Sequence, residues 1–276
     1  MPNIIQVRRT LLRPPPVAAA AGFTPTSTES SDFLARATTI ADDADKTIYD
    51  ALISGLVADG DFSTLDGLYI WRQDRTAALL NLRQNAYNLT EHGTVSFSSS
   101  LGYTGNGTDF YLDTGFNPFS ASSPQYTKDS ASVGVYVQSN ITSGTSGGYV
   151  LGADSTGTLH LAPFYSGNSI YAINGDNKSV SSSTSQGLWV LTRTASNAFA
   201  LYRNGSTTAV DTDTSASDFL PHANIFFFAE NSGGANLPSA AQMSAGFIGS
   251  GLTSAAMARI AARINTFMTA YGINVY

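Results

Sequence analysis

Carboxylate and histidine side chains are the first places to look for catalytic chemistry in this sequence. Glycoside hydrolysis needs two carboxyl groups that flank the scissile bond, about 5 Å apart in retaining enzymes. The glutamates, Glu29, Glu91 and Glu230, are scattered along the chain. Asp109 and Asp113 lie on one expected strand, where four residues of strand rise separate them by about 13 Å. No pair has the spacing that this chemistry requires, so we expect the protein not to be an enzyme.

Metal-dependent and serine-dependent hydrolysis find no better support. His92, His160 and His222 are far apart, and no His-Glu-x-x-His pattern is present. We also expect no nucleophile elbow among the many serines. His160 lies between Leu159 and Leu161, so its side chain leaves the face that these leucines bury. We expect a structural histidine with a hydrogen-bond partner; an exposed residue on a concave face is the alternative.

Composition and charge indicate the fold class. Of the 276 residues, 42% are hydrophobic and 12% are charged, and the net charge is −6. Abundant Gly, Ser, Thr and Asn between short apolar runs are typical of a β protein with many short strands. The absence of cysteine excludes disulfides and cysteine-ligated metals. A thinly spread acidic charge predicts no nucleic-acid partner. No run reaches the ~20 apolar residues of a membrane span, so we expect no membrane insertion.

The first 30 residues are expected to form an extended arm. Three consecutive prolines favour polyproline II, and the residues that follow show no apolar period. We expect this arm to anchor the protein in a partner. The anchoring residues would be Arg8, Arg9, Arg13, Pro14, Pro15 and Pro16.

Helices are predicted before and after a central β region. Asp42 or Asp43 can cap a helix that ends at Gly60, within a helical lead-in over residues 31–82. Thr253 can cap the C-terminal helix. The apolar stripe of that helix is the width of a packing face, so we expect it to lie against the β region.

From residue 83 to 276 we expect a β-sandwich followed by the C-terminal helix. The apolar period is two, and turn-forming clusters separate the short runs. Phe110 and Leu112 should face the core, and Tyr111 and Asp113 should face away from it. The expected strands are 95–97, 110–114, 132–138, 148–152, 158–164, 169–174, 188–194, 199–203 and 224–229.

Four segments in order carry a resemblance to a known fold family. They read GYTGNGTDFYLDTGFNP from residue 102, ASVGVYVQS from 131, GLWVLTRTASNAFALYRNGS from 187 and AGFIGSGLTSAAMARIAARINTFMTAYG from 245. Over residues 45–272 the chain resembles the concanavalin A-like, laminin-G-like jelly rolls, above all those in bacteriophage structural proteins. The resemblance implies a mainly β, two-sheet antiparallel sandwich. In GYTGNG we expect Gly105 and Gly107 to supply positive φ at the turn before the first long strand.

The resemblance also implies a function. We expect a non-enzymatic bacteriophage virion protein of the decoration, head-fibre or tail-fibre type, which binds other virion proteins through its arm and is a homo-oligomer. The alternative is a carbohydrate-binding adhesin for host-surface glycans. A glycoside hydrolase with an unfamiliar site is a third, weaker hypothesis.

Ligand-binding residues follow from the same resemblance. Jelly-roll lectins stack aromatic faces on sugars at a concave sheet or at rim loops. The candidate sugar-binding residues are Tyr103, Tyr126, Tyr165 and Tyr171. Laminin-G-like domains sometimes hold Ca²⁺ with loop aspartates. The candidate ligands are Asp109, Asp113 and Asp154, although turn capping explains such aspartates better.

Overall fold

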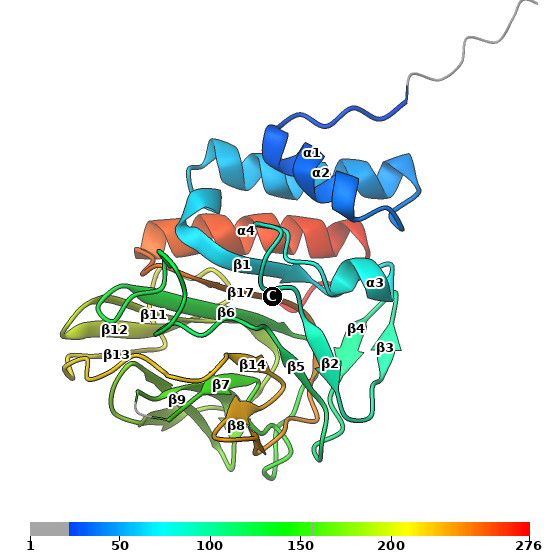
Figure 1. Cartoon of the computed structure of the whole chain (residues 1–276). Coiled ribbons are helices and arrows are strands. Elements are labelled where there is room, and N and C mark those ends of the chain that lie inside the picture. Colours follow the sequence, from blue (N-terminus) through cyan, green and yellow to red (C-terminus); the bar gives the residue numbers. More distant parts are fainter. Residues whose placement is uncertain (1–21, 156) are drawn as a thin grey trace, which may run out of the picture.

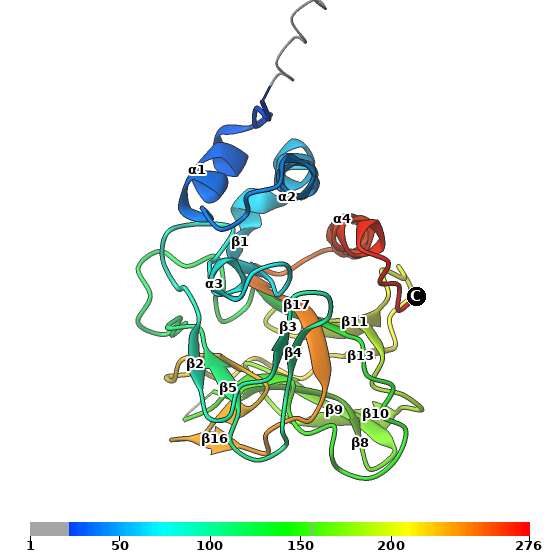
Figure 2. The same cartoon turned by 90° about the vertical axis from the view of Figure 1, so that its right-hand side faces the viewer.

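The computed structural model describes residues 22–155 and 157–276 (Figure 1). Two β-sheets stack on each other, and helices cover the outer side of one of them (Figure 1). Figure 2 shows the same layers from the side. The expected two-sheet antiparallel sandwich with a C-terminal helix is therefore confirmed.

Sheet A lies in the middle of the molecule, with strand order β13-β12-β11-β6-β17-β4-β3 and β1 added beside β17. Its strands are β1 (Leu65–Ile70), β3 (Phe97–Ser98), β4 (Gly102–Thr104), β6 (Ala131–Val137), β11 (Gly187–Ala195), β12 (Ala198–Arg203), β13 (Asp211–Asp213) and β17 (Gln242–Gly249). The pairs within sheet A are antiparallel.

Sheet B forms the other layer, with strand order β10-β9-β8-β7-β14-β5-β2. Its strands are β2 (Thr90–His92), β5 (Tyr111–Asp113), β7 (Leu151–Ala153), β8 (Leu159–Tyr165), β9 (Asn168–Ile173), β10 (Lys178–Ser181), β14 (Phe226–Phe227), β15 (Glu230–Asn231) and β16 (Ala235–Asn236). The β15–β16 hairpin pairs with β7 through β15.

The helices are α1 (Thr28–Arg36), α2 (Asp43–Ala58), α3 (Arg75–Ala78) and α4 (Ser254–Ala270), with a 3₁₀ turn η1 (Phe62–Thr64) before β1. Asp42 caps α2 by accepting a hydrogen bond from the Ala44 N–H at 2.8 Å, and Gly60 after the helix has φ +77°. Thr253 caps α4 by accepting from the Ala256 N–H at 3.2 Å. These predicted caps are confirmed. No helix in the described part of the chain could span a bilayer.

Sheet A is buried on both faces, and this decides where the core lies. Trp189 and Leu191 of β11 face sheet B, whereas Leu188 and Val190 of the same strand face the helices. Near-continuous apolar strands are expected when both faces are covered. Among residues 22–155 and 157–276, no helix covers the outer face of sheet B (Figure 1).

Two features differ from the sequence-based expectations, and one prediction lies outside the part of the chain that the structure describes. Helix α1 begins at Thr28, inside the arm predicted for residues 1–30, because Ser27 caps it and its Phe33 packs into the helical layer. The anchoring residues Arg8, Arg9, Arg13 and Pro14–Pro16 lie outside the described residues. Strand β17, in the middle of sheet A, was not predicted, because Ser244, Gly246 and Gly249 interrupt its apolar alternation.

The GYTGNG turn behaves as expected at one glycine and differently at the other. Gly107 has φ +70°, as predicted. Gly105 does not have positive φ; instead, a Cβ there would lie 1.9 Å from the carbonyl oxygen of Ser239. Glycine is needed at 105 because two backbone segments approach closely. Phe110 and Leu112 are buried in the core, as predicted.

Candidate functional site

Three of the four tyrosines expected at a ligand-binding rim lie in the core instead. The rings of Tyr103, Tyr126 and Tyr171 are buried between the two sheets. Their hydroxyls donate hydrogen bonds to internal partners, which are Glu91, Asn174 and Asp211 respectively. Burial raises the pKa of each hydroxyl. The rim assignment is wrong for these three, because Tyr can bury its ring while its hydroxyl reaches a polar group at the core's edge.

The fourth, Tyr165, is partly exposed at the end of β8. It lines a separate pocket of about 430 Å³ together with Asn106, Ser146 and Leu237. Ser146 is the central residue of Gly144–Gly148, which reads Gly-Thr-Ser-Gly-Gly and therefore has the letters of a nucleophile elbow. An elbow needs a strand-to-helix turn. Here the segment is a loop that leads into strand β7, so the structural context of an elbow is missing.

The three aspartates proposed as calcium ligands hold turns. Asp109 accepts from the Thr94 N–H at 3.2 Å, Asp113 from the Gly115 N–H at 2.8 Å and Asp154 from the Ser155 N–H at 2.7 Å. The described residues contain no group of three or more acidic or histidine side chains that could hold a metal ion. Turn capping, the preferred interpretation of these residues, fits the contacts observed.

His160 forms a buried pair with Glu230 on the outer face of sheet B. Its Nδ1 lies 2.9 Å from Glu230 Oε1, and the second carboxylate oxygen accepts from the Asn236 amide at 2.7 Å. The Tyr149 ring stacks on the imidazole at 4.5 Å between centroids. The predicted structural histidine with a hydrogen-bond partner is confirmed.

Aromatic rings on the same face of sheet B stack on one another. Tyr111 stacks between His92, at 4.6 Å, and Phe226, at 4.3 Å between ring centroids. A sugar is recognised on the flat face of a ring, where its C–H groups meet the π electrons. Because these rings turn their faces to each other, this row presents mainly edges to a ligand.

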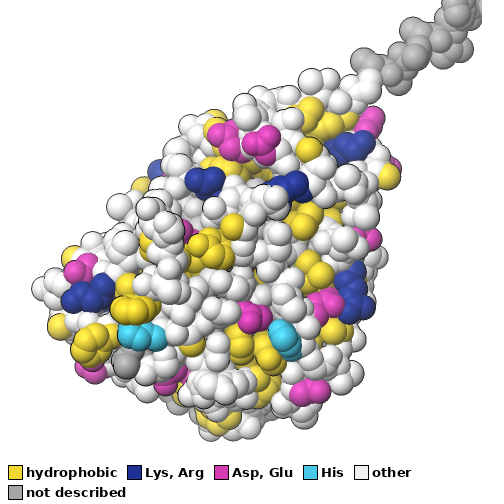
Figure 3. Space-filling model, viewed as in Figure 1, with side chains coloured by type: hydrophobic (Ala, Val, Ile, Leu, Met, Phe, Trp, Pro, Cys, Tyr) yellow, Lys and Arg dark blue, Asp and Glu magenta, His cyan; other side chains and the backbone are white. Residues whose placement is uncertain are grey.

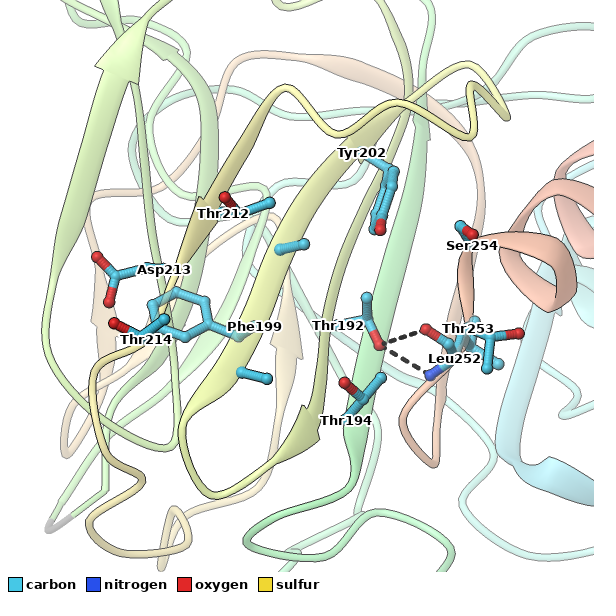
Figure 4. Close-up of a pocket in the computed structure, with 12 residues that line it drawn as sticks. Thr192, Thr194, Phe199, Tyr202, Thr212, Asp213, Thr214, Leu252, Thr253 and Ser254 are labelled. Atoms are coloured by element: carbon cyan, nitrogen blue, oxygen red, sulfur yellow. Dashed lines mark hydrogen bonds between the residues drawn. The ribbon is translucent and has the colours of Figure 1, made fainter.

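A different pocket, on the outer face of sheet A, has more suitable chemistry. It has a volume of about 350 Å³ and lies where β11, β12 and β13 meet the start of α4 (Figure 4). Its lining residues are Thr192, Thr194, Ala198, Phe199, Ala200, Tyr202, Thr212, Asp213, Thr214, Leu252, Thr253 and Ser254. We call it the threonine pocket.

Strand register builds the floor of the threonine pocket. Thr192, Ala200 and Thr212 are paired across β11, β12 and β13 and so form one row on the same face. Ala200, in the centre of the row, has the smallest side chain, which leaves the hollow. Tyr202 stands at one end of this surface and Ser254 of α4 at its side (Figure 4).

Hydroxyl groups dominate the polar chemistry of the threonine pocket. The Thr192 hydroxyl donates to the Leu252 carbonyl at 3.3 Å and accepts from the Leu252 N–H at 2.8 Å, which fixes the segment before α4 (Figure 4). The hydroxyls of Thr194, Thr212 and Thr214 make no hydrogen bond to another residue drawn in Figure 4. Each hydroxyl can donate one hydrogen bond and accept two, so these groups suit a ligand that also carries hydroxyls.

The one ionised lining residue, Asp213, is already compensated. Ser215 donates its backbone N–H to the carboxylate at 2.6 Å, and Lys178 Nζ lies 3.1 Å away. Hydrogen bonds from Ser215 are the main cause that lowers the pKa of Asp213, and Lys178 adds to the effect. The threonine pocket therefore presents little net charge to a ligand.

Comparison with known proteins bears on the fold. No protein-family model and no curated protein matches the sequence. The botulinum neurotoxin serotype D binding domain is similar in structure, with a TM-score of 0.52 and 11% identity over 73% of this chain and 52% of that chain. The receptor-binding domain of a botulinum neurotoxin C/D mosaic has a TM-score of 0.51 and 13% identity, over 73% of this chain and 51% of that chain. Trypanosoma rangeli sialidase in complex with sialic acid has a TM-score of 0.51 and 12% identity, over 74% of this chain and 34% of that chain.

The fold is shared. At these identities the likeness extends no further than the sandwich itself. The chain spans about half the length of the two toxin structures. The threonine pocket therefore has to be judged on its own residues.

Sequence reasoning did not find the threonine pocket. Its signal is present in LTRTA and DTDT, where alternate threonines point to one face of β11 and β13. That these two strands flank β12, and that α4 starts beside them, depends on the register of sheet A. The alternation alone could not bring Thr194, Thr214 and Ser254 together.

Proposed function

We propose that this chain is a non-enzymatic, lectin-like binding protein that holds an uncharged sugar in the threonine pocket. The observation that carries the proposal is the combination of free hydroxyls, a small apolar floor and the Tyr202 ring in one hollow of about 350 Å³. Sugars offer C–H faces for such a floor and ring, and hydroxyls for such walls.

The surroundings of the acidic residues support binding without hydrolysis. Glu91 is held by Arg75, at 2.8 Å from Nε to Oε1, and also by the Tyr103 hydroxyl. Glu230 is buried against His160. Neither faces the threonine pocket, whose one carboxylate, Asp213, has no second carboxylate among the lining residues. We expect no turnover of polysaccharides; hydrolysis that Asp213→Asn abolishes would overturn this part.

The structural neighbours are consistent with a binding role. Two of them are described as toxin binding or receptor-binding domains, and the sialidase is seen with sialic acid. On the face shown in Figure 3, charged side chains of both signs are scattered, without a continuous basic patch. That surface is better suited to an uncharged ligand than to a polyanion.

A glycan array followed by calorimetric titration tests the proposal. Tyr202→Ala should weaken binding about tenfold or more, since truncating an aromatic side chain that stacks on a ligand commonly costs over 1 kcal/mol. Tyr202→Phe should keep the stacking. Tyr165→Ala, at the separate pocket, is the matched control. An array without any bound glycan, or equal losses from Tyr202→Ala and Tyr165→Ala, would reject the threonine pocket as the site.

We also propose, from the sequence resemblance, that the protein belongs to a bacteriophage virion and is held there as a homo-oligomer by its arm. The motivation is the basic, proline-rich segment before residue 22. Deleting residues 1–21 leaves α1 intact, so the body should fold while incorporation into particles is lost. Normal incorporation of the deleted form would count against this placement.

A further inference from the structure

We propose that the ligand is a neutral oligosaccharide rather than a single sugar, and that a second subsite binds its further units at the loop end of the sandwich. This inference rests on the proposed sugar-binding function. The second subsite consists of Phe219 with the adjacent polar pocket at Asp176 and Asp218. We infer this subsite from its position relative to the threonine pocket, from the exposed ring of Phe219 and from its charge.

Two phenylalanines at this loop end are exposed to an extent unusual for so apolar a side chain. Phe119 is 60% exposed and Phe219 is 56% exposed. His222, three residues after Phe219, stacks on the Phe119 ring at 3.6 Å between centroids. An aromatic ring exposed to this extent can offer its face to a sugar. Phe219, in contrast to the rings on sheet B, is in no aromatic stack within the described residues.

A polar hollow of about 230 Å³ adjoins Phe219. Its lining residues are Gly157, Thr158, Gly175, Asp176, Asn177 and Asp218. The Asp218 N–H donates to the Asn174 carbonyl at 2.7 Å, which holds the loop against the end of β9. A Cβ on Gly157 would lie 1.9 Å from the Phe219 carbonyl oxygen, so glycine there allows the loop to pack closely. The backbone that carries Phe219 is therefore held on both sides.

The two subsites are joined by one short segment. Thr214 lines the threonine pocket, and Asp218, four residues later, lines the polar hollow. Five residue steps from Thr214 to Phe219 span at most about 17 Å. The segment is fastened along its length, because the Ser217 N–H donates to the Ser196 carbonyl at 2.6 Å. A ligand of several sugar units can therefore contact both subsites.

Charge selects the class of oligosaccharide. The polar hollow is lined by two carboxylates and by no lysine, arginine or histidine. Sugars that carry carboxylates, such as sialic or uronic acids, would meet like charges there, whereas neutral sugars can donate hydroxyl hydrogen bonds to Asp176 and Asp218. The structure thus favours neutral chains over acidic ones.

Titration with matched sugar series tests the second subsite. The probes are one- to four-unit oligomers of glucose, mannose, galactose and N-acetylglucosamine, with sialyl and galacturonate chains alongside. For the series that binds, affinity should rise about tenfold or more with length, as expected when a second set of contacts is added. Phe219→Ala should remove this rise and leave the single-unit affinity unchanged. Leu237→Ala is the control, because Leu237 is 42% exposed and lines neither subsite. It should change neither the rise with length nor the single-unit affinity.

The outcomes separate the two proposals. Affinity independent of chain length, or equal weakening of one-unit and four-unit ligands by Phe219→Ala, would overturn the second subsite while leaving the threonine pocket in place. Tighter binding of the acidic chains would overturn the neutral class. If no sugar of any length binds, the proposed function itself fails. Thermal unfolding of each variant shows whether lost binding comes from misfolding. Asp218→Asn is a second probe of the subsite, because it keeps the backbone hydrogen bond from residue 218 to Asn174.

Discussion

The Arg193 guanidinium lies over the Phe199 ring, 4.6 Å from its centroid, and the whole arginine side chain is buried. Its Nε donates to the Ile173 carbonyl at 2.9 Å, and its Nη1 donates to the carbonyls of Ser196 and Ser215 at 2.9 and 3.1 Å. One side chain thus ties together β9, the β11–β12 hairpin and the loop after β13. Both proposed subsites are built on these segments.

Replacing Arg193 with methionine should destabilise the protein strongly. The variant leaves buried carbonyls without donors, at a cost of about 1–3 kcal/mol for each such group. We expect the free energy of unfolding in urea to fall by about 3 kcal/mol or more. Arg75→Met is the control, because Arg75 is 53% exposed and its pair with Glu91 should contribute under about 1 kcal/mol. Similar losses from both variants would contradict this role of Arg193.

The Arg263–Asp59 pair should make part of the stability acid-sensitive. Arg263 Nε and Nη2 lie 2.9 and 3.1 Å from the two Asp59 oxygens, and these hydrogen bonds are the main cause that lowers the pKa of Asp59. A carboxyl whose pKa is lower in the folded state adds stability above its unfolded pKa of about 3.9 and loses it as the pH falls through the folded value.

A double-mutant cycle of Arg263→Met and Asp59→Asn measures this contribution. The coupling energy should be up to about 1 kcal/mol at pH 7, as for other partly exposed pairs, and should decrease as the pH falls through the lowered folded-state pKa of Asp59. A coupling energy that does not change with pH would show that the pair does not act through the charge of Asp59.

Gly134→Ala should destabilise the contact between sheet A and α4. A Cβ at residue 134 would lie 2.1 Å from Cε1 of Phe247, a ring buried between the sheet and the helices. The ring must move, and overpacking of this kind costs about 1–3 kcal/mol. Adding Phe247→Leu makes room, so the double variant should lose less than the sum of the two single variants. Strict additivity in urea unfolding would argue against the clash.

Ala200→Leu should block the threonine pocket without unfolding the protein. Ala200 forms the pocket floor on the outer face of β12, so a larger side chain there occupies the hollow. We expect sugar affinity to fall about tenfold or more, on the scale of a lost central contact. Ala209→Leu, on the connection between β12 and β13, should retain binding. Full affinity of the Ala200→Leu variant would place the ligand elsewhere.

Local sequence patterns were sufficient for much of the fold. The period of two predicted the strands, and β6, β8, β9, β11 and β12 lie within a few residues of the expected ranges. Asp42 and Thr253 marked the starts of α2 and α4, because a cap is a contact with residues two or three positions away. Strand β17 was missed because its pattern is broken by small residues that the neighbouring strands tolerate.

The candidate sites show where local patterns stop being informative. Tyr103 and Tyr171 were expected to contact a sugar, but the packing of the two sheets places both rings in the core. Thr192 and Thr212 face the opposite side of sheet A, in one row with Ala200. That their side of the sheet is hollow, with α4 beginning beside it, depends on residues some 60 positions later in the chain.

The sequence by itself determined a β-sandwich with capped helices, because periodicity and capping depend on neighbours along the chain. The tertiary structure decided which tyrosines are buried and which threonines share a pocket, because both depend on what lies across a sheet. A residue's neighbours in space follow from strand register and layer packing, which no short stretch of sequence contains.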